Sequence, residues 1–376
     1  MMYKIGEVFT LIRNGANIKQ GEDDTGYPIT RIETISNRVV DRNKMGYAGI
    51  HEIGRYSDYI LEDGDILMSH INSETHLGKV ALYEKIPGET IIHGMNLLCL
   101  RPNRSILNCR YAFYSLMSDG FLRQIPRIMK KSVNQASFTV TALKELQIHV
   151  PPMEQQLQIV SVMDRIQSLL LQRQKQAAVI DQLVKSRFIE LFGDPVSNDK
   201  GWKKVVITEV CHAIFGGGTP SKSHPEYFAG SIPWVSPKDM KSSVINDSID
   251  HITEKAIAHS TTNLVPANSV LMVIRSGILK HSLPVAINSL PVTINQDMKA
   301  FVPNETVKTA FLMHFFKAIE NDVLAGVRGV TADNIDFKAF QKRTIIVPPL
   351  ALQEQFAAFV EQTDKSKLCG KMEVAA

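Results

Sequence analysis

The feature that most constrains this 376-residue chain is a sequence repeat whose two copies lie about 200 residues apart. The first copy closes in Ile148-His-Val-Pro-Pro-Met-Glu-Gln-Gln-Leu-Gln-Ile159, and the second closes in Ile345-Ile-Val-Pro-Pro-Leu-Ala-Leu-Gln-Glu-Gln-Phe356. The two segments align without a gap at an offset of 197 residues. The aligned pairs are Pro151 with Pro348, Pro152 with Pro349, Gln156 with Gln353, and Gln158 with Gln355.

The repeat extends upstream, so it predicts two copies of a domain and not of a short tag. The lysine-bearing openings at 3–8 and 202–207 are both expected to lead into a first apolar strand. Residues 27–35 match 232–240 at an offset of 205, and residues 62–68 match 266–272 at an offset of 204. The drifting offset indicates that loops differ in length while the framework is kept.

Composition fits two soluble domains. The chain is long enough for two domains of roughly 150 residues, and 44% apolar with 21% charged residues is typical of globular proteins. No apolar run approaches the roughly 18 residues of a membrane span, and the first residues lack the apolar core of a signal peptide. We therefore expect a cytoplasmic protein without membrane association. Four cysteines without a C-x-x-C pair argue against a zinc ribbon or a disulfide framework.

A long helix is predicted after the first copy. Residues 153–192 contain no glycine or proline, which predicts a helix of roughly 60 Å. Two heptad positions are mostly apolar, as in a coiled-coil seam. The first holds Ile159, Ile166, Arg173, Ile180 and Arg187, and the second holds Met163, Leu170, Ala177, Val184 and Leu191.

The natural partner for that seam is the helix that follows the second copy, which carries Leu352, Phe356, Phe359 and Val360. Antiparallel pairing would make a rod with one domain at each end. The alternative is a pair of core helices folded back on one compact body. The second helix is expected to be short, and Gly370 is expected to interrupt it.

Each copy reads as mixed α and β, with short apolar strands followed by a late helix near 110–117 and 309–320. The predicted fold class is α+β, with two similar mixed α/β domains separated by long coiled-coil-type helices. The predicted boundaries are 1–150 for the first domain, 151–195 for the central helix, 196–346 for the second domain and 347–376 for the C-terminal helix.

Known catalytic patterns do not occur. Gly216-Gly-Gly-Thr-Pro-Ser-Lys222 matches neither phosphate-loop pattern, and a turn that leaves a strand is its expected role. The chain has no G-x-S-x-G and no H-E-x-x-H. We predict no catalytic, cofactor-binding or metal-binding residues.

Charge by itself indicates little, because the net charge is only +4. Five basic residues between Arg110 and Lys131 face one acid, Asp119. Such a cluster can focus a local field, but a solvated helix face is the alternative that charge alone favours.

The doubled arrangement, the two Pro-Pro-x-x-x-Gln-x-Gln junctions, the closing Leu191-Phe-Gly-Asp-Pro195 and the opening Trp202-Lys-Lys-Val205 resemble the DNA-specificity subunits of type I restriction-modification systems. The resemblance covers nearly the whole chain. It implies two target-recognition domains that each read one half of a bipartite double-stranded DNA site. It also implies helices that fix the spacing and dock methyltransferase subunits, with restriction subunits joining the complex.

In such a complex the chemistry would belong to the partners. S-adenosylmethionine, ATP and Mg²⁺ are expected on partner subunits and not on this chain, which would be a non-catalytic subunit. The chain lacks the Asn/Asp-Pro-Pro-Tyr/Phe signature of adenine methyltransferases, since Asp194-Pro-Val-Ser197 does not match. Two other functions stay open: a doubled protein scaffold without DNA recognition, and a DNA-modifying enzyme with an unrecognised site.

Basic and amide side chains in corresponding loops are the candidate DNA contacts, because such groups bind phosphates and base edges. In the first domain they are Lys19, Arg31, Lys130, Lys131, Asn134 and Gln135, and in the second they are Lys222, Lys238, Arg275, Lys280 and Arg328.

Overall fold

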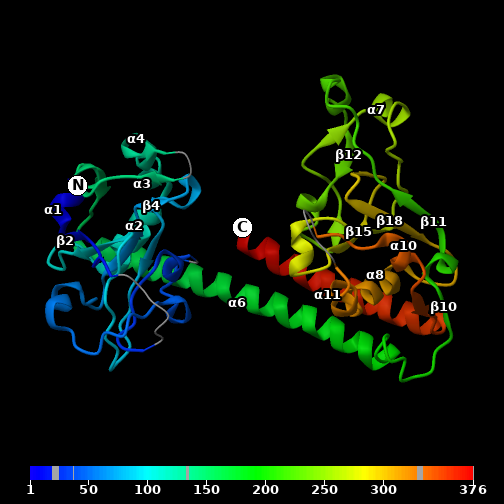
Figure 1. Cartoon of the computed structure of the whole chain (residues 1–376), viewed down its shortest axis with the longest axis horizontal. Coiled ribbons are helices and arrows are strands. Elements are labelled where there is room, and N and C mark those ends of the chain that lie inside the picture. Colours follow the sequence, from blue (N-terminus) through cyan, green and yellow to red (C-terminus); the bar gives the residue numbers. More distant parts are fainter. Residues whose placement is uncertain (19–24, 37, 133–134, 328–332, 376) are drawn as a thin grey trace. The chain divides into compact units, whose positions relative to one another are not determined.

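The structure, a computed structural model, describes residues 1–18, 25–36, 38–132, 135–327 and 333–375, with side chains up to residue 366 (Figure 1). It divides into two compact units, Met1–Leu170 and Leu171–Ala376. A long helix, α6 (Met153–Phe192), belongs to both. Both units are mixed α/β, which confirms the predicted fold class. None of the described helices combines the length and apolar character that a membrane span requires.

The first unit is built on an antiparallel sheet in the order β2-β6-β3-β5. Its strands are β2 (Phe9–Asn14), β3 (Ile66–Ser69), β5 (Val80–Leu82) and β6 (Leu97–Pro102). Alternate residues point to opposite faces of a strand, so Ile66 and Met68 join one core cluster while Leu67 joins another. Helix α2 (Cys109–Met117) contributes the buried residues that cover the first of these faces.

The second unit repeats that sheet, in the order β11-β18-β15-β16-β13. The strands are β11 (Cys211–Gly216), β13 (Val244–Ile245), β15 (Val270–Val273), β16 (Val285–Asn288) and β18 (Met298–Pro303). Helix α8 (Thr309–Ala318) takes the place of α2. A small sheet of β14 (His251–Ile252), β12 (Ile232–Val235) and β17 (Thr293–Ile294) corresponds to single bridges from Ile29 to Gly46 and Ile92 in the first unit. The strands β11-β18-β15-β16 therefore follow the same topology as β2-β6-β3-β5 in the first unit.

A two-stranded ladder closes each unit before its long helix. β1 (Met2–Lys4) pairs with β9 (Gln147–His149), and β10 (Lys204–Val206) pairs with β19 (Thr344–Ile346). Each opening leads into the expected strand through one helical turn: α1 (Ile5–Val8) precedes β2 in the first unit, and a 3-10 turn (Ile207–Val210) precedes β11 in the second. The remaining α-helices are α3 (Asp119–Leu122), α4 (Ile125–Ile128), α5 (Val140–Lys144), α7 (Glu254–Ala258), α9 (Glu320–Leu324) and α10 (Phe337–Gln341).

The predicted long helix is confirmed. α6 runs for 40 residues, roughly 60 Å at 1.5 Å per residue. Gly193 ends it in the left-handed region (φ 75°), where a residue without a Cβ is favoured. The Gly193 amide donates to the Ile189 carbonyl at 2.7 Å. The second long helix, α11 (Leu350–Ala375), continues past Gly370, so the expected interruption at that glycine is wrong.

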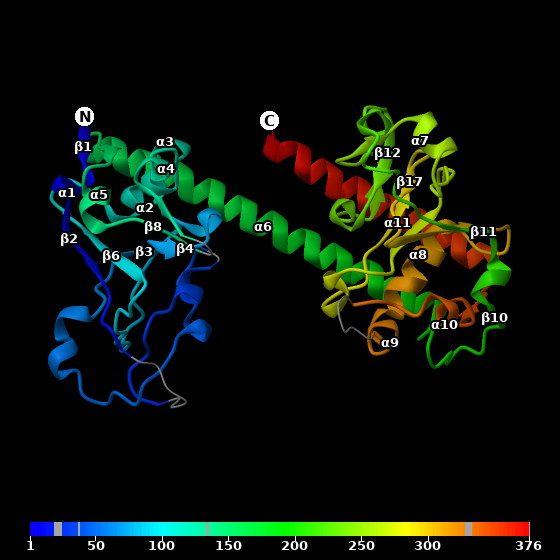
Figure 2. The same cartoon turned by 45° about the horizontal axis from the view of Figure 1, so that its top comes forward.

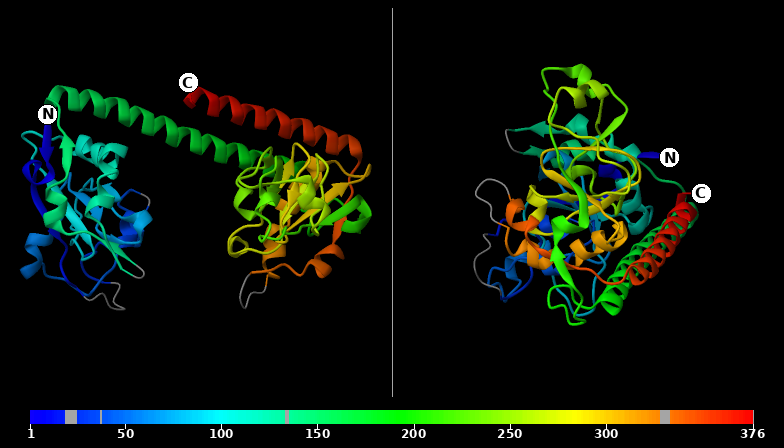
Figure 3. Two further views of the ribbon diagram at one scale, coloured as in Figure 1. Left: turned by 90° about the horizontal axis from the view of Figure 1, so that it is seen from above. Right: turned by 90° about the vertical axis from the view of Figure 1, so that its right-hand side faces the viewer.

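The C-terminal half of α6 packs antiparallel against the first turns of α11 (Figure 3). Phe188 and Phe192 lie 5.4 and 5.5 Å from Phe356 between ring centroids. Arg187 stacks over Phe359 at 6.0 Å, one turn further along α11. Residue numbers fall along one helix as they rise along the other, which agrees with the antiparallel seam that the sequence predicts.

The N-terminal half of α6 carries the same apolar pattern, and none of the described side chains covers it. The side chains of Ile159, Ile166 and Leu170 are 41%, 46% and 44% exposed, whereas Val184 is 4% exposed. We call the uncovered residues the open stripe; they are Ile159, Val162, Met163, Ile166, Leu169 and Leu170. At 100° per residue they continue the face that carries Val184 and Leu191.

Two histidines of the first unit lie in its core. His70 and His93 are 7% and 1% exposed. Burial lowers the pKa of His70 to about 4 and that of His93 to about 3, because a charged imidazolium loses its hydration there. Both rings are therefore neutral at physiological pH.

We predict that the first unit loses stability as the pH falls below 6.5. An unfolded histidine takes up a proton near pH 6.5, while these two do so only near pH 4 and pH 3 in the folded chain. Stability from their burial is complete above pH 6.5 and falls by up to about 1.4 kcal/mol per pH unit for each histidine. NMR of ¹³C-labelled histidine rings should show that His70 and His93 stay neutral at pH 5; a midpoint near 6.5 for these two rings would contradict the prediction.

Candidate DNA interface

A three-stranded ladder extends the first unit beyond the end of β3. Its strands are β4 (Ile71–Asn72), β8 (Ala136–Ser137) and β7 (Lys130–Lys131), in that order. Figure 2 shows β4 beside β8. The Phe138 amide donates to the His70 carbonyl at 3.1 Å, which ties the ladder to the residue after β3. We call this feature the outer ladder.

The second unit has the same ladder in a shorter form. Arg275 forms an antiparallel bridge with Asn334, as Ile71 does with Ser137. The Ile335 amide donates to the Ile274 carbonyl at 2.9 Å, which repeats the bond from Phe138 to His70. The pairing places Arg275 of the second unit where the first unit has Ile71.

A turn at the start of β6 and β18 lies beside each ladder, and we call it the sheet-end turn (Gly94–Asn96 and Asn295–Asp297). In the second unit the Asp297 carboxylate contacts the Arg275 guanidinium at 2.6 Å. It also accepts a hydrogen bond from the Asn295 side chain at 3.2 Å. The turn therefore holds Arg275 of the outer ladder in place.

Glycine lets the segment that follows β2 or β11 pack closely against the sheet-end turn. An added Cβ at Gly15 would lie 1.9 Å from the Gly94 carbonyl oxygen, and one at Gly217 would lie 1.7 Å from that of Asn295. No larger residue fits at either approach. The glycine run leaves β11 as the sequence predicts, and close backbone packing requires glycine at Gly217.

The predicted contact residues fall into two groups. Lys130, Lys131 and Gln135 belong to the hairpin of the first outer ladder, and Arg275 and Lys280 lie at or just after the second one. Arg31 caps a 3-10 turn at 32–35, whereas Lys222 and Lys238 follow the glycine run and β12 respectively. Lys19, Asn134 and Arg328 lie outside the described residues.

Most of these cations have an acidic partner within their own unit. Lys131 contacts Glu74 at 2.9 Å, Lys280 contacts Asp333 at 3.8 Å, and Lys238 contacts Asp250 at 2.6 Å. The hydrogen bond to Asp250 raises the pKa of Lys238. Exposed pairs of this kind contribute little stability, so a phosphate could replace the carboxylate. Lys130 and Lys222 make no ion pair within the described part of the chain.

The sheet-end turn also holds two residues that the sequence did not single out. Met95 and Gln296 occupy corresponding positions, and both side chains are exposed. Gln296 accepts a hydrogen bond from the Thr219 hydroxyl. The two segments share almost no sequence, so only the paired strands show that they correspond.

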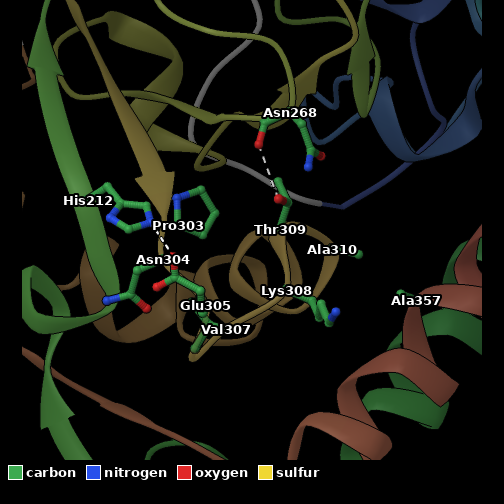
Figure 4. Close-up of a pocket in the computed structure, with 10 residues that line it drawn as sticks. All are labelled: His212, Asn268, Pro303, Asn304, Glu305, Val307, Lys308, Thr309, Ala310 and Ala357. Atoms are coloured by element: carbon green, nitrogen blue, oxygen red, sulfur yellow. Dashed lines mark hydrogen bonds and ion pairs between the residues drawn. The ribbon is translucent and has the colours of Figure 1, made fainter.

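A groove of about 470 Å³ opens elsewhere in the second unit, at the start of α8 (Figure 4). His212 and Glu305 point toward one another there at 3.1 Å. The Thr309 hydroxyl donates to the Asn268 carbonyl at 3.1 Å. None of the predicted contact residues lines this groove. Within the described residues, no three His, Cys, Asp or Glu side chains gather as metal ligands would.

Comparison with known families identifies the framework. The sequence-family model named "Type I restriction modification DNA specificity domain" matches residues 1–180 and again residues 199–370. The chain belongs to this family. The double match coincides with the duplicated sheets, ladders and helices described above.

Named relatives agree with that assignment. The chain is 42% identical over 207 residues to the "Putative type I restriction enzyme MjaX specificity subunit" of Methanocaldococcus jannaschii, which covers 55% of this chain and 48% of the relative. It is 40% identical over 153 residues to the EcoR124I/EcoR124II specificity subunit of Escherichia coli, which covers 40% and 38%. The chain thus spans about half, or less, of the length of these curated relatives.

Solved structures of the same kind share the fold of the specificity-family chain. The type I S subunit from M. genitalium superposes with a TM-score of 0.56 at 13% identity, covering 100% of this chain and 92% of that one. A structure from work on complex assembly and conformational transition of the type I restriction-modification system gives 0.53 at 18% identity, with the same coverage. At these identities the likeness supports the fold alone.

Proposed function

We propose that this chain is the DNA-binding specificity subunit of a type I restriction-modification complex, and that each unit reads one half of a bipartite site. One observation carries the proposal: the two units share a framework but present different side chains at corresponding positions. Arg275 replaces Ile71 in the outer ladder, and Gln296 replaces Met95 in the sheet-end turn. A duplicated framework with unlike surfaces suits two different half-sites.

The residue types suit duplex DNA. Lysines position a protein on phosphates, while arginine and glutamine form bidentate bonds with guanine and adenine edges in the major groove. Arg275 is prearranged by Asp297, which lowers the ordering cost of a base contact. Lys130 of the first ladder is exposed and lacks an acidic partner among the described residues, so it is available to a phosphate.

The long helix α6 supplies the spacing in this proposal. Its roughly 60 Å of continuous helix is a stiff connection between the two units. A stiff connection of the right length makes the second half-site contact effectively intramolecular, so two weak contacts combine into a tight one. The preferred spacer between half-sites then depends on helix length.

The open stripe of α6 is the proposed docking surface for methyltransferase subunits. Six exposed apolar residues in a continuous helical stripe fit an amphipathic partner helix. Restriction subunits would join through the methyltransferase. The catalytic steps, which use S-adenosylmethionine, ATP and Mg²⁺, are assigned to these partners, and this chain is assigned no catalytic residue.

Methylation mapping tests the proposal. The chain and its methyltransferase partner are expressed together and separately in cells without other adenine methylation, and modified adenines are located by long-read sequencing. A split motif that appears only when both are present is expected. Methylation by this chain alone would favour the enzyme alternative, and partner binding without any motif would favour the scaffold alternative.

Reversing the charge of Lys130 and Lys131 is predicted to weaken DNA binding at every sequence. If both lysines contact phosphates, the slope of log affinity against log salt should fall by about 2, because each contact releases about one counterion. Affinity of the complex for its site is measured by fluorescence anisotropy from low to moderate salt.

The control reverses Lys85 and Lys144, which are exposed in the same unit and lie outside the outer ladder. It changes the net charge equally. A general field effect would weaken both variants alike, whereas contact through the ladder weakens only the first. Equal slopes for the Lys130/Lys131 variant and the unchanged chain would remove the outer ladder from the interface.

Inserting four helix-forming residues after Leu170 is predicted to lengthen the preferred spacer by one or two base pairs. The insertion adds about 6 Å and rotates the helix by about 40°, and successive base pairs are about 3.4 Å apart. The site lies after Asp164, where α6 contacts the first unit, and before Val184, where it is buried in the second. Selection from a duplex library with randomised half-sites and spacers measures both properties at once.

Alanine at the exposed residues Gln172, Lys175 and Gln176 changes the same stretch of helix without lengthening it. That variant should keep the original spacer. Altered half-sites with an unaltered spacer in the insertion variant would refute the role of α6 as the spacing element.

A further inference from the structure

The repeated junction motif contains two glutamines in each copy, and the structure separates them. Gln156 and Gln353 are fully buried (0% exposed). Gln158 and Gln355, two residues further on, are exposed. Identical residue types at a fixed spacing therefore have different roles, and only the buried pair faces its own domain.

Each buried glutamine makes three hydrogen bonds to backbone groups. The Oε1 atom of Gln156 accepts from the Asn108 amide at 2.8 Å, and its Nε2 atom donates to the carbonyls of Ile106 and Pro151 at 2.8 and 2.9 Å. The Oε1 atom of Gln353 accepts from the Lys308 amide at 2.8 Å. Its Nε2 atom donates to the carbonyls of Thr306 and Pro348 at 3.1 and 2.8 Å.

The three bonds connect the same three segments in both units. One is the first turn of the long helix, one is the proline segment before it, and one is the loop that leads into α2 or α8. Asn108 and Lys308 are the N-cap residues of those two helices. The side chain therefore fixes the direction in which α6 or α11 starts relative to a helix of its own domain.

Glutamine is the side chain that meets this set of requirements. Its amide offers one acceptor and two donors, and both donors are used. Glutamate lacks the donors, asparagine is one methylene shorter, and methionine has a similar shape without either function. Loss of the amide would leave a buried N–H and two buried carbonyls to find other partners.

We infer that Gln156 and Gln353 are positioning residues, which set the directions of α6 and α11 and thereby the half-site spacing that the complex accepts. This inference rests on the proposed function. The mechanism is local, because every bond joins a helix to its own unit. If the helix can leave its unit in more than one direction, the complex accepts more spacer lengths. The bases that each unit reads stay the same.

The test compares Gln156→Met and Gln353→Met with Gln158→Met and Gln355→Met in the full chain bound to its methyltransferase subunits. Duplexes carry the two half-sites at spacers from two base pairs shorter to two longer than the preferred one. Loss of either buried glutamine should reduce the discrimination between the best and the next spacer at least threefold, with the half-site sequences unchanged. The exposed variants should keep full discrimination.

Hydrogen exchange provides a second readout that does not involve DNA. The Asn108 amide should exchange faster in the Gln156→Met chain, and the Lys308 amide should do so in the Gln353→Met chain. Faster exchange with unchanged spacer discrimination would overturn the inference while leaving the proposed function intact. An unmodified complex that shows no spacer preference would overturn the proposed function itself. If a methionine variant does not fold, Gln→Asn, which keeps the amide but shortens its reach, replaces it under the same two criteria.

Discussion

The buried amide of one glutamine in each unit is the interaction on which the architecture depends. A long helix that starts at the surface of a domain needs a defined direction. Gln156 and Gln353 supply the direction through bonds to the loop before α2 or α8 and to the preceding proline segment. Surrounding apolar side chains keep water out, so the bonds persist without competition. The Pro-Pro and Gln residues repeat together because they form one structural element.

Beyond these junctions the two units differ in how they bind their long helix. In the first unit Asp164 of α6 accepts a hydrogen bond from Tyr114 at 2.5 Å and pairs with Arg110 at 2.6 Å. Burial, together with that carboxylate, raises the pKa of Tyr114 to about 12, so the phenol remains a donor. In the second unit an aromatic cluster of Phe188, Phe311 and Phe356 performs the same task. One framework thus tolerates a polar or an apolar contact once the amide has set the direction.

Much of the framework is readable from the sequence because it depends on local periodicity. The repeat, the 40-residue helix and the strands around Leu67, Leu98 and Leu271 follow from spacing and glycine or proline boundaries. The outer ladders do not, since the bridge between Arg275 and Asn334 joins residues far apart in sequence. The sequence also does not show which surface cations are paired with carboxylates. Arg275 and Lys238 look like free cations in sequence, and only the fold brings Asp297 and Asp250 to them.

The heptad pattern of α6 predicts only part of what the structure shows. A heptad pattern states which residues of α6 can be buried, but not what buries them. Val184 and Leu191 meet α11 and the second domain, whereas Ile159 and Ile166 carry the same pattern into solvent. Exposing that much apolar surface is unfavourable unless a partner covers it. The stripe begins one turn after Gln156, so the residue that directs α6 also determines which way this surface faces. In the proposed function, the half-site spacing and the docking of partner subunits therefore depend on the same junction.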